Sequence, residues 1–210
     1  GAAPATVSVT MLGKDGARPL SGAQSVTIDA GSVFDIQLAG VPAGTYGVQV
    51  TSNTPVGAAA RMVRSGGEYP ARSKALVHDQ AWAQAALPGA ADSGLLAVPR
   101  ATSLSSAVTV ANSGETTSVT LSSLDGSWKQ DVKVAKGSSS VVEVPAKVSA
   151  VRLNAAGQKG SSGASHTSSG LAAATIVTAQ AGGDLAGTLI STVPAQPDAT
   201  VQAQRRILLD

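Results

Sequence analysis

Apolar and polar residues alternate with a period of two along most of the chain, which is the pattern of half-buried β-strands. Residues 74–87 form either a strand or a short helix through 79–86, and we favour extended chain with one helical turn. Short strands separated by glycine- and proline-containing turns favour a β-sandwich. The expected strands are 6–11, 25–28, 33–38 and 46–51 in the first half, and 107–111, 118–124, 130–134, 140–144 and 148–153 in the second.

The chain repeats part of its own pattern. Segments 26–36 and 132–144 both lead from alternating β-branched residues into a glycine, Gly31 or Gly137, followed by serine and renewed alternation. We expect both glycines to adopt positive φ, where other residues are strained. Three matches in the same order predict two copies of one β module. The two further pairs of similar segments are 57–63 with 171–177 and 9–16 with 119–126.

These patterns predict an all-β chain of tandem immunoglobulin-like antiparallel β-sandwiches. We place the first module and a crossover segment at 1–98, and the second module with its closing strands at 99–210. The second copy has an extra leading strand at 107–111 with no counterpart before Val9. Either the first module begins before this sequence does, or another segment completes its sheet, because an unpaired edge invites association. The candidate segments are 187–193 and 200–209.

Composition excludes several classes of function. The chain has no cysteine, so disulfides and thiol chemistry are absent. Only 13% of residues are charged, with a net charge of +2, and the basic residues are dispersed without interleaved aromatics. We therefore expect no nucleic-acid partner. No apolar run approaches the roughly 18 residues that cross a bilayer, so a membrane would be reached only through an anchor upstream of this sequence.

Groups that carry out catalysis are scarce. The two histidines are His78, next to Asp79, and His166, in a Gly/Ser-rich stretch that is a poor place to hold a base. If 74–87 is a strand, His78 and Asp79 point to opposite faces. There is no Gly-x-Ser-x-Gly elbow, no phosphate-binding glycine loop and no metal-ligand spacing. We predict no catalytic residues, no metal and no cofactor, and hence no enzyme.

Trp82 and Trp128 are the candidate ligand-binding residues. A sugar-binding surface needs an exposed flat ring beside amides and hydroxyls, and both indoles have such neighbours. Trp82 lies between Gln80 and Gln84, and Trp128 follows Ser127 just after a turn. The alternative is that a chain with only five aromatic residues uses these rings as packing anchors. We favour packing for both indoles, with Trp128 the one nearer the surface.

The order of several short motifs resembles an uncharacterised family of actinobacterial proteins. The motifs are Pro55-Val-Gly-Ala-Ala-Ala-Arg-Met-Val63, Asp79-Gln-Ala-Trp82, Val108-Thr-Val-Ala-Asn-Ser-Gly114 and the closing stretch to Asp210. That family comprises secreted or membrane-anchored cell-envelope proteins, often encoded beside a large glycosyltransferase. The resemblance implies an exported protein with tandem sandwiches, found outside the cell or in its envelope, and gives no catalytic residues.

Our leading hypothesis is a non-catalytic extracellular scaffold or interaction module of the bacterial cell envelope, whose partner is an envelope protein or polysaccharide. The alternative is a carbohydrate-binding module that uses an exposed tryptophan. A deep pocket in which His78 faced a serine or aspartate from elsewhere in the chain would instead favour an enzyme.

Overall fold

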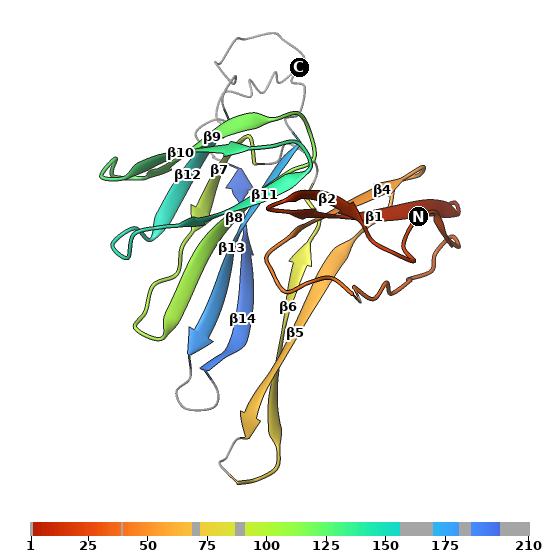
Figure 1. Ribbon diagram of the computed structural model, residues 1–210, viewed down its shortest axis with the longest axis horizontal. Helices are drawn as coiled ribbons and strands as arrows, with labels where there is room; N and C mark the ends of the chain where they lie inside the picture. Colours follow the sequence, from red (N-terminus) through yellow and green to blue (C-terminus); the bar gives the residue numbers. More distant parts are fainter. Residues whose placement is uncertain are drawn as a thin grey trace, which may run out of the picture.

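A computed structural model describes residues 2–38, 40–68, 72–86, 91–155, 170–180 and 186–197 (Figure 1). Every regular element within these ranges is a β-strand, and every strand pair is antiparallel. The expected all-β antiparallel class is confirmed. The strands are β1 Ala5–Gly13, β2 Gly16–Pro19, β3 Val26–Ile28, β4 Gly47–Ser52, β5 Ala59–Glu68, β6 Leu76–Gln84, β7 Ser93–Ala97, β8 Leu104–Asn112, β9 Thr117–Ser123, β10 Lys129–Val134, β11 Ser138–Glu143, β12 Ala150–Ala155, β13 Leu171–Gln180, β14 Ala186–Pro194 and β15 Gln196–Pro197.

The second half of the chain folds as a β-sandwich. One sheet has the strand order β10-β9-β12-β7-β15, and the other has the order β11-β8-β13-β14. The core between them consists almost entirely of valine and leucine, each contributing about 1.5–3 kcal/mol when fully buried. Alternation therefore predicted these strands well, since one face of each is buried. The innermost core residues are Leu96, Val98, Val108, Val110, Val119, Leu121, Val134, Val151, Leu153 and Leu171.

Two fully buried polar residues connect the two sheets. Asn112 on β8 donates from Nδ2 to the carbonyls of Val134 and Glu115, at 3.1 and 2.8 Å, and its Oδ1 accepts the Gly114 N–H. Thr175 on β13 donates its hydroxyl to the Ala97 carbonyl on β7, at 2.8 Å. Buried polar groups with complete hydrogen bonding fix the relative position of the sheets.

The connectivity of this sandwich departs from the immunoglobulin arrangement. As in that fold, β8 and β11 share one sheet while β9 and β12 share the other. The strands on either side of these four, β7 and β13, have exchanged sheets relative to the immunoglobulin fold. β7, which precedes β8 in the chain, pairs with β12, and β13, which follows β12, pairs with β8. β7 ends just before the module boundary expected at residue 98, yet it belongs to the C-terminal sandwich.

The first half contains a four-stranded sheet around β1. β4 pairs along one edge of β1, while β3 and β2 pair with successive parts of the other edge. A small core of Ala5, Val7, Val9, Leu20 and Ala23 lies on one side of this sheet. The strand expected at 33–38 is not formed, so that prediction is wrong. No described strand pairs with it, and alternation alone supplies no hydrogen-bond partner.

β5 and β6 form a separate long hairpin that runs beside β14 and extends past it (Figure 1). The helical turn expected within 79–86 is wrong, because β6 continues as a strand to Gln84. Alanine favours helix, but packing of alternate residues of β6 against β14 outweighs that weak preference. β14 was one of two segments expected to complete the first module. It pairs with β13 and packs against this hairpin. The other, 200–209, lies outside the described residues.

The repeat is visible in the turns. The Asp15-Gly16 and Asp125-Gly126 segments join hairpins in the two halves, β1 to β2 and β9 to β10. As expected, Gly31 and Gly137 have positive φ, at 72° and 69°. Beyond the two glycines the halves diverge. The chain after Gly137 crosses into the second sheet as β11, whereas the corresponding residues 33–38 after Gly31 form no strand.

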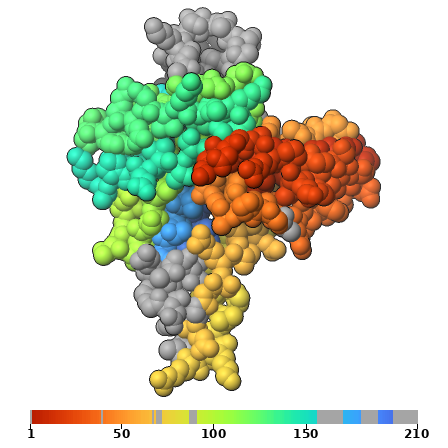
Figure 2. All heavy atoms as spheres, viewed as in Figure 1, coloured from red at the N-terminus to blue at the C-terminus, as the bar shows by residue number. Residues whose placement is uncertain are grey.

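The N-terminal sheet packs closely against the sandwich (Figure 2). Gly47 on β4 lies so near Ala111 on β8 that a Cβ at position 47 would overlap the Ala111 Cβ. A Cβ on Gly137 would lie 2.9 Å from the Cβ of Ala17 on β2. Glycine at positions 47 and 137 therefore permits the two halves to approach at backbone distance.

Candidate functional site

One face of the β5–β6 hairpin is exposed from Ala59 to Ser65 on β5 and from His78 to Gln84 on β6. The register pairs Arg61 with Trp82 and Val63 with Gln80, which places all four side chains on the same face. We call this surface the hairpin face. Each of its members is exposed to solvent. The hairpin face consists of Ala59, Arg61, Val63 and Ser65 on β5 and His78, Gln80, Trp82 and Gln84 on β6.

The opposite face of the hairpin packs against β14. Ala81 is buried there, and Asp79 is half-buried. The Asp79 carboxylate accepts the Ile190 N–H at 2.6 Å, and the hydroxyl of Thr192 donates to the Trp82 carbonyl at 2.9 Å. These side-chain bonds hold β6 beside the outer edge of β14 without a backbone ladder. The hairpin is thereby anchored with its other face turned to solvent.

Trp82 is the central residue of the hairpin face. Its side chain is 56% exposed, and the Arg61 guanidinium lies 5.7 Å from the centre of its ring, a cation–π contact that restrains the indole. Packing was the favoured interpretation of Trp82 from sequence, and the structure shows this to be wrong. Because β6 is a strand, its side chains point alternately to opposite faces, and those of residues 78, 80, 82 and 84 point away from β14.

An open hollow of about 500 Å³ lies beside Trp82. Gly57, Ala58, Ala59, Trp82 and Gln84 line it. The side-chain amide of Gln84 carries both a hydrogen-bond donor and an acceptor. The hollow thus combines a flat apolar ring with hydrogen-bonding groups of both kinds.

Trp128 packs, as we favoured, but the expectation that it lies nearer the surface than Trp82 is wrong. It is half-buried and packs against the core of the sandwich. Its backbone N–H donates to the Ser123 hydroxyl oxygen at 2.9 Å, and its backbone carbonyl accepts the Ser123 N–H. In the same turn, hydrogen bonds from the Ser123 hydroxyl and from the backbone and hydroxyl of Ser127 lower the pKa of the exposed Asp125 to about 2.

Histidine and aspartate do not combine as a catalytic pair. His78 lies on the hairpin face opposite Ser65, while Asp79 is turned to the other side and bound to Ile190, so the expected divergence of these neighbours is confirmed. His166 lies outside the described residues. Within the described part of the chain, no group of three or more His, Asp or Glu side chains is placed to hold a metal ion.

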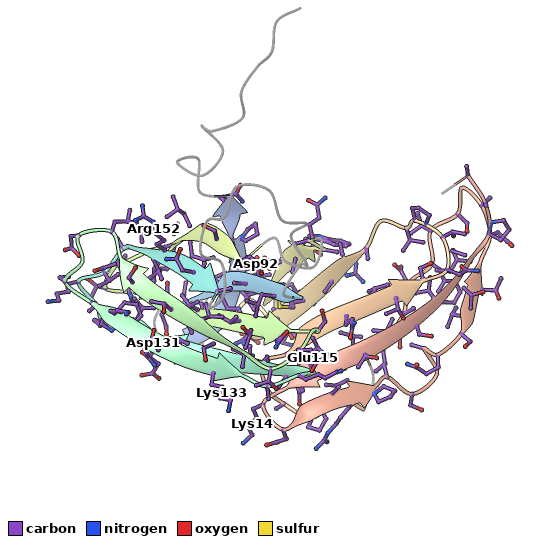
Figure 3. All side chains as sticks on the ribbon, turned by 90° about the horizontal axis from the view of Figure 1, so that it is seen from above. Lys14, Asp92, Glu115, Asp131, Lys133 and Arg152 are labelled. Atoms are coloured by element: carbon purple, nitrogen blue, oxygen red, sulfur yellow. The ribbon has the colours of Figure 1, made fainter. Side chains whose placement is uncertain are left out.

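The other ionisable groups are spread over the molecule (Figure 3). Asp131 on β10 accepts the Thr120 hydroxyl at 2.5 Å, and the exposed Lys136 and Glu115 form an ion pair at 2.6 Å. These contacts are local and lie along the sheet surface, so they assemble no shared pocket with the hairpin face. The described residues also contain no helix of the length and apolarity needed to span a bilayer.

Sequence reasoning named Trp82 and its glutamines but missed Arg61 and Val63. The signal for them lay in β5, where positions 59, 61, 63 and 65 alternate with 60, 62 and 64. Which residues of β5 share a face with Trp82 is known only once the hairpin register is known. A slip of one residue would bring positions 60, 62 and 64 onto this face instead.

Comparison with known proteins places the chain in a family. No curated protein and no solved structure is significantly similar to it. A family profile matches residues 1–145, which cover the N-terminal sheet, the hairpin and the sandwich as far as the loop after β11. Because this match spans more than half of the sequence, the chain belongs to the family of unknown function DUF5719.

Proposed function

We propose that this protein is a non-catalytic interaction module of the bacterial cell envelope, exported from an actinobacterium, and that it holds its partner on the hairpin face. The observation that carries this proposal is the contrast between the two sides of one hairpin. One side is anchored on β14 through Asp79 and Thr192, and the other presents Trp82 and Val63 more than half exposed. Exposed large apolar side chains gathered on one surface are typical of a binding site.

The neighbours of Trp82 favour polysaccharide as the partner, the second candidate function. A pyranose ring has a face of C–H groups that stacks on an indole, and its hydroxyls pair with amides. The hollow supplies both, from Trp82 and Gln84, and Gln80 lies two positions along the same face. Sugar-binding surfaces of this kind need no ionisable pair, which agrees with the dispersed charges of this chain.

Co-sedimentation with insoluble bacterial wall polysaccharide tests the sugar-binding function. We expect Trp82→Ala to weaken retention at least tenfold, and Trp128→Phe to leave retention unchanged because its side chain packs in the sandwich. Equal retention of the wild type and Trp82→Ala would contradict binding on the hairpin face. Absence of retention by the wild type would remove polysaccharide as the partner.

Complementation in the producing bacterium tests the non-catalytic role. We expect a strain that lacks the gene to be restored by His78→Ala and Ser65→Ala, because this cross-strand pair lies outside the hollow beside Trp82, but not by Trp82→Ala. Both small substitutions are on exposed positions and should leave folding intact. Loss of function in His78→Ala, with an unchanged melting temperature and unchanged retention on wall polysaccharide, would overturn the proposal and point to catalysis, because weakened binding would not explain it.

A further inference from the structure

The hairpin face carries a positive charge and no carboxylate. Arg61 is its permanently charged member, and its other polar members are Ser65, His78, Gln80 and Gln84. Arginine stays protonated at every pH at which proteins are folded, so this charge is constant. The sign of the charge bears on which sugars the surface binds.

The carboxylates nearest to Arg61 along the hairpin do not neutralise it. Asp79 lies on the opposite face and accepts the Ile190 N–H. Glu68 lies farther along β5, past a register shift, and the strand from Arg61 to Glu68 spans roughly 20 Å. Charges in solution are screened over about 8 Å at physiological salt. The positive charge of Arg61 is therefore available to a ligand.

The guanidinium of Arg61 is held in place and keeps its hydrogen-bond donors. It lies 5.7 Å from the centre of the Trp82 ring. Contact with an aromatic ring occupies the flat face of a guanidinium, while its N–H groups point outward in the plane. Arg61 is exposed, and within the described part of the chain it forms no hydrogen bond or ion pair. A restrained guanidinium with free donors can bind a carboxylate through two parallel hydrogen bonds.

Arg61 and the hollow offer two different contacts around one indole. Trp82 and Gln84 line the hollow together with residues 57–59, and Arg61 is not among its lining residues. A sugar can thus reach the indole from the hollow without displacing the guanidinium. A pyranose is about as wide as an indole, and in a uronic acid the carboxylate projects from the edge of that ring.

We propose that the polysaccharide held on the hairpin face is acidic, and that Arg61 pairs with the carboxylate of a uronic acid unit whose ring stacks on Trp82. This inference deepens the proposed function and rests on it. The amides of Gln80 and Gln84 bind hydroxyls of that unit and its neighbours. A neutral sugar makes the same stacking and amide contacts but leaves the guanidinium unpaired.

The number of charges favours a carboxylate over a phosphate. One planar guanidinium matches one planar, singly charged carboxylate. Phosphate groups carry more charge and are typically bound by several donors together, such as the backbone N–H groups of a helix N-terminus or a glycine-rich loop. The hairpin face, as defined by its eight residues, offers the single guanidinium of Arg61 on an antiparallel hairpin.

Removal of the carboxylates from the ligand tests the proposal on the full chain. The probe is the wall polysaccharide of the producing bacterium, used untreated and after carbodiimide activation and borohydride reduction. This treatment converts each uronic acid into a neutral sugar and retains the ring. In co-sedimentation we expect the wild type to bind the untreated polymer at least threefold more tightly, as for one exposed ion pair. The preference should fall as salt is raised.

Two variants assign the preference to a residue. Arg61→Gln keeps a hydrogen-bonding amide but removes the charge, and should bind both polymers with equal affinity. Lys133→Gln removes the same charge from an exposed position on β10 of the sandwich, and should keep the wild-type preference. Melting temperatures check that both variants fold. A preference that persists in Arg61→Gln would overturn the proposal.

Failure of this inference is distinguishable from failure of the proposed function. Equal retention of the wild type on both polymers, with retention still lost in Trp82→Ala, would overturn the acidic ligand and leave the sugar-binding surface intact. Pairing of Arg61 with a carboxylate of this chain outside the described residues would give that same result. Absence of retention on either polymer would overturn both proposals.

Discussion

Ser32 and Ser138 close the same turn in the two halves of the chain. The N–H and hydroxyl of Ser32 donate to the Asp29 carbonyl at 3.2 and 2.7 Å, and those of Ser138 donate to the Ala135 carbonyl at 3.2 and 2.8 Å. The residue before each serine is a glycine with φ near 70°. A repeat that was inferred from a pattern of residue types therefore extends to individual hydrogen bonds.

The two glycines should respond differently to alanine. At both positions alanine is strained by the positive φ, which costs about 1–2 kcal/mol. Gly31 has open space around it, whereas a Cβ at Gly137 would meet Ala17 at 2.9 Å. We expect Gly31→Ala to lower the free energy of unfolding by about 1 kcal/mol, and Gly137→Ala by about 2 kcal/mol or more. Urea denaturation measures both, and equal losses would contradict the close approach.

The contact of Gly47 with Ala111 should show strong coupling. Gly47→Ala places two methyl groups in overlapping positions, and we expect a loss of about 2–3 kcal/mol in the free energy of unfolding. Ala111→Gly removes one of those methyl groups and should recover at least half of that loss in the double variant. A double-mutant cycle in urea measures this. Additive effects would mean that the N-terminal sheet does not pack on β8.

Replacing each of two buried threonines on neighbouring strands with valine should change the stability of the protein in opposite directions. The Thr109 hydroxyl has no hydrogen-bond partner among the described residues, whereas that of Thr175 donates to the Ala97 carbonyl. We expect Thr109→Val to stabilise the protein by about 1 kcal/mol, and Thr175→Val to destabilise it by about 1 kcal/mol or more. Thermal melting separates the outcomes. A loss of stability in Thr109→Val would show that its hydroxyl does make a bond.

Asp125 should contribute to the loss of stability of the folded protein at acid pH. Hydrogen bonds from Ser123 and Ser127 lower its pKa from 3.8 to about 2, so the ionised carboxylate is favoured in the folded state. This stabilisation is present above about pH 4 and is lost as the pH falls toward 2. We expect the difference in melting temperature between wild type and Asp125→Asn to shrink over that range. A constant difference from pH 5 to pH 2 would contradict the lowered pKa.

Local pattern predicted most strands, because one buried face imposes alternation on the residues of β1, β8, β9 and β12. It failed for 33–38, where the alternation is present but no neighbouring strand supplies hydrogen bonds. It also missed β2, β5, β7 and β13. The pairing of β7 with β12, for example, joins residues more than fifty positions apart. Pairing between distant segments is a property of the whole fold and leaves little trace in the local sequence.

The candidate site was only partly predictable for a related reason. Trp82 stood out as one of two tryptophans, and its glutamine neighbours were visible in the sequence. Whether it was buried depended on how β6 is placed, and β6 is held by contacts far along the chain, the bonds of Asp79 with Ile190 and of Thr192 with the Trp82 carbonyl. The same contact explains why Asp79, although next to His78, is a structural residue.

The most direct test of the account is the fluorescence of Trp82 alone, in a Trp128→Phe variant titrated with soluble fragments of bacterial wall polysaccharide. Because Trp82 is 56% exposed, we expect red-shifted emission that saturably shifts or quenches on titration. Lys136→Ala in the same background should behave identically, because Lys136 lies on the sandwich and outside the hairpin face. Red-shifted emission that stays constant at saturating polysaccharide, or blue-shifted emission without ligand, would contradict the hairpin face as a sugar-binding surface.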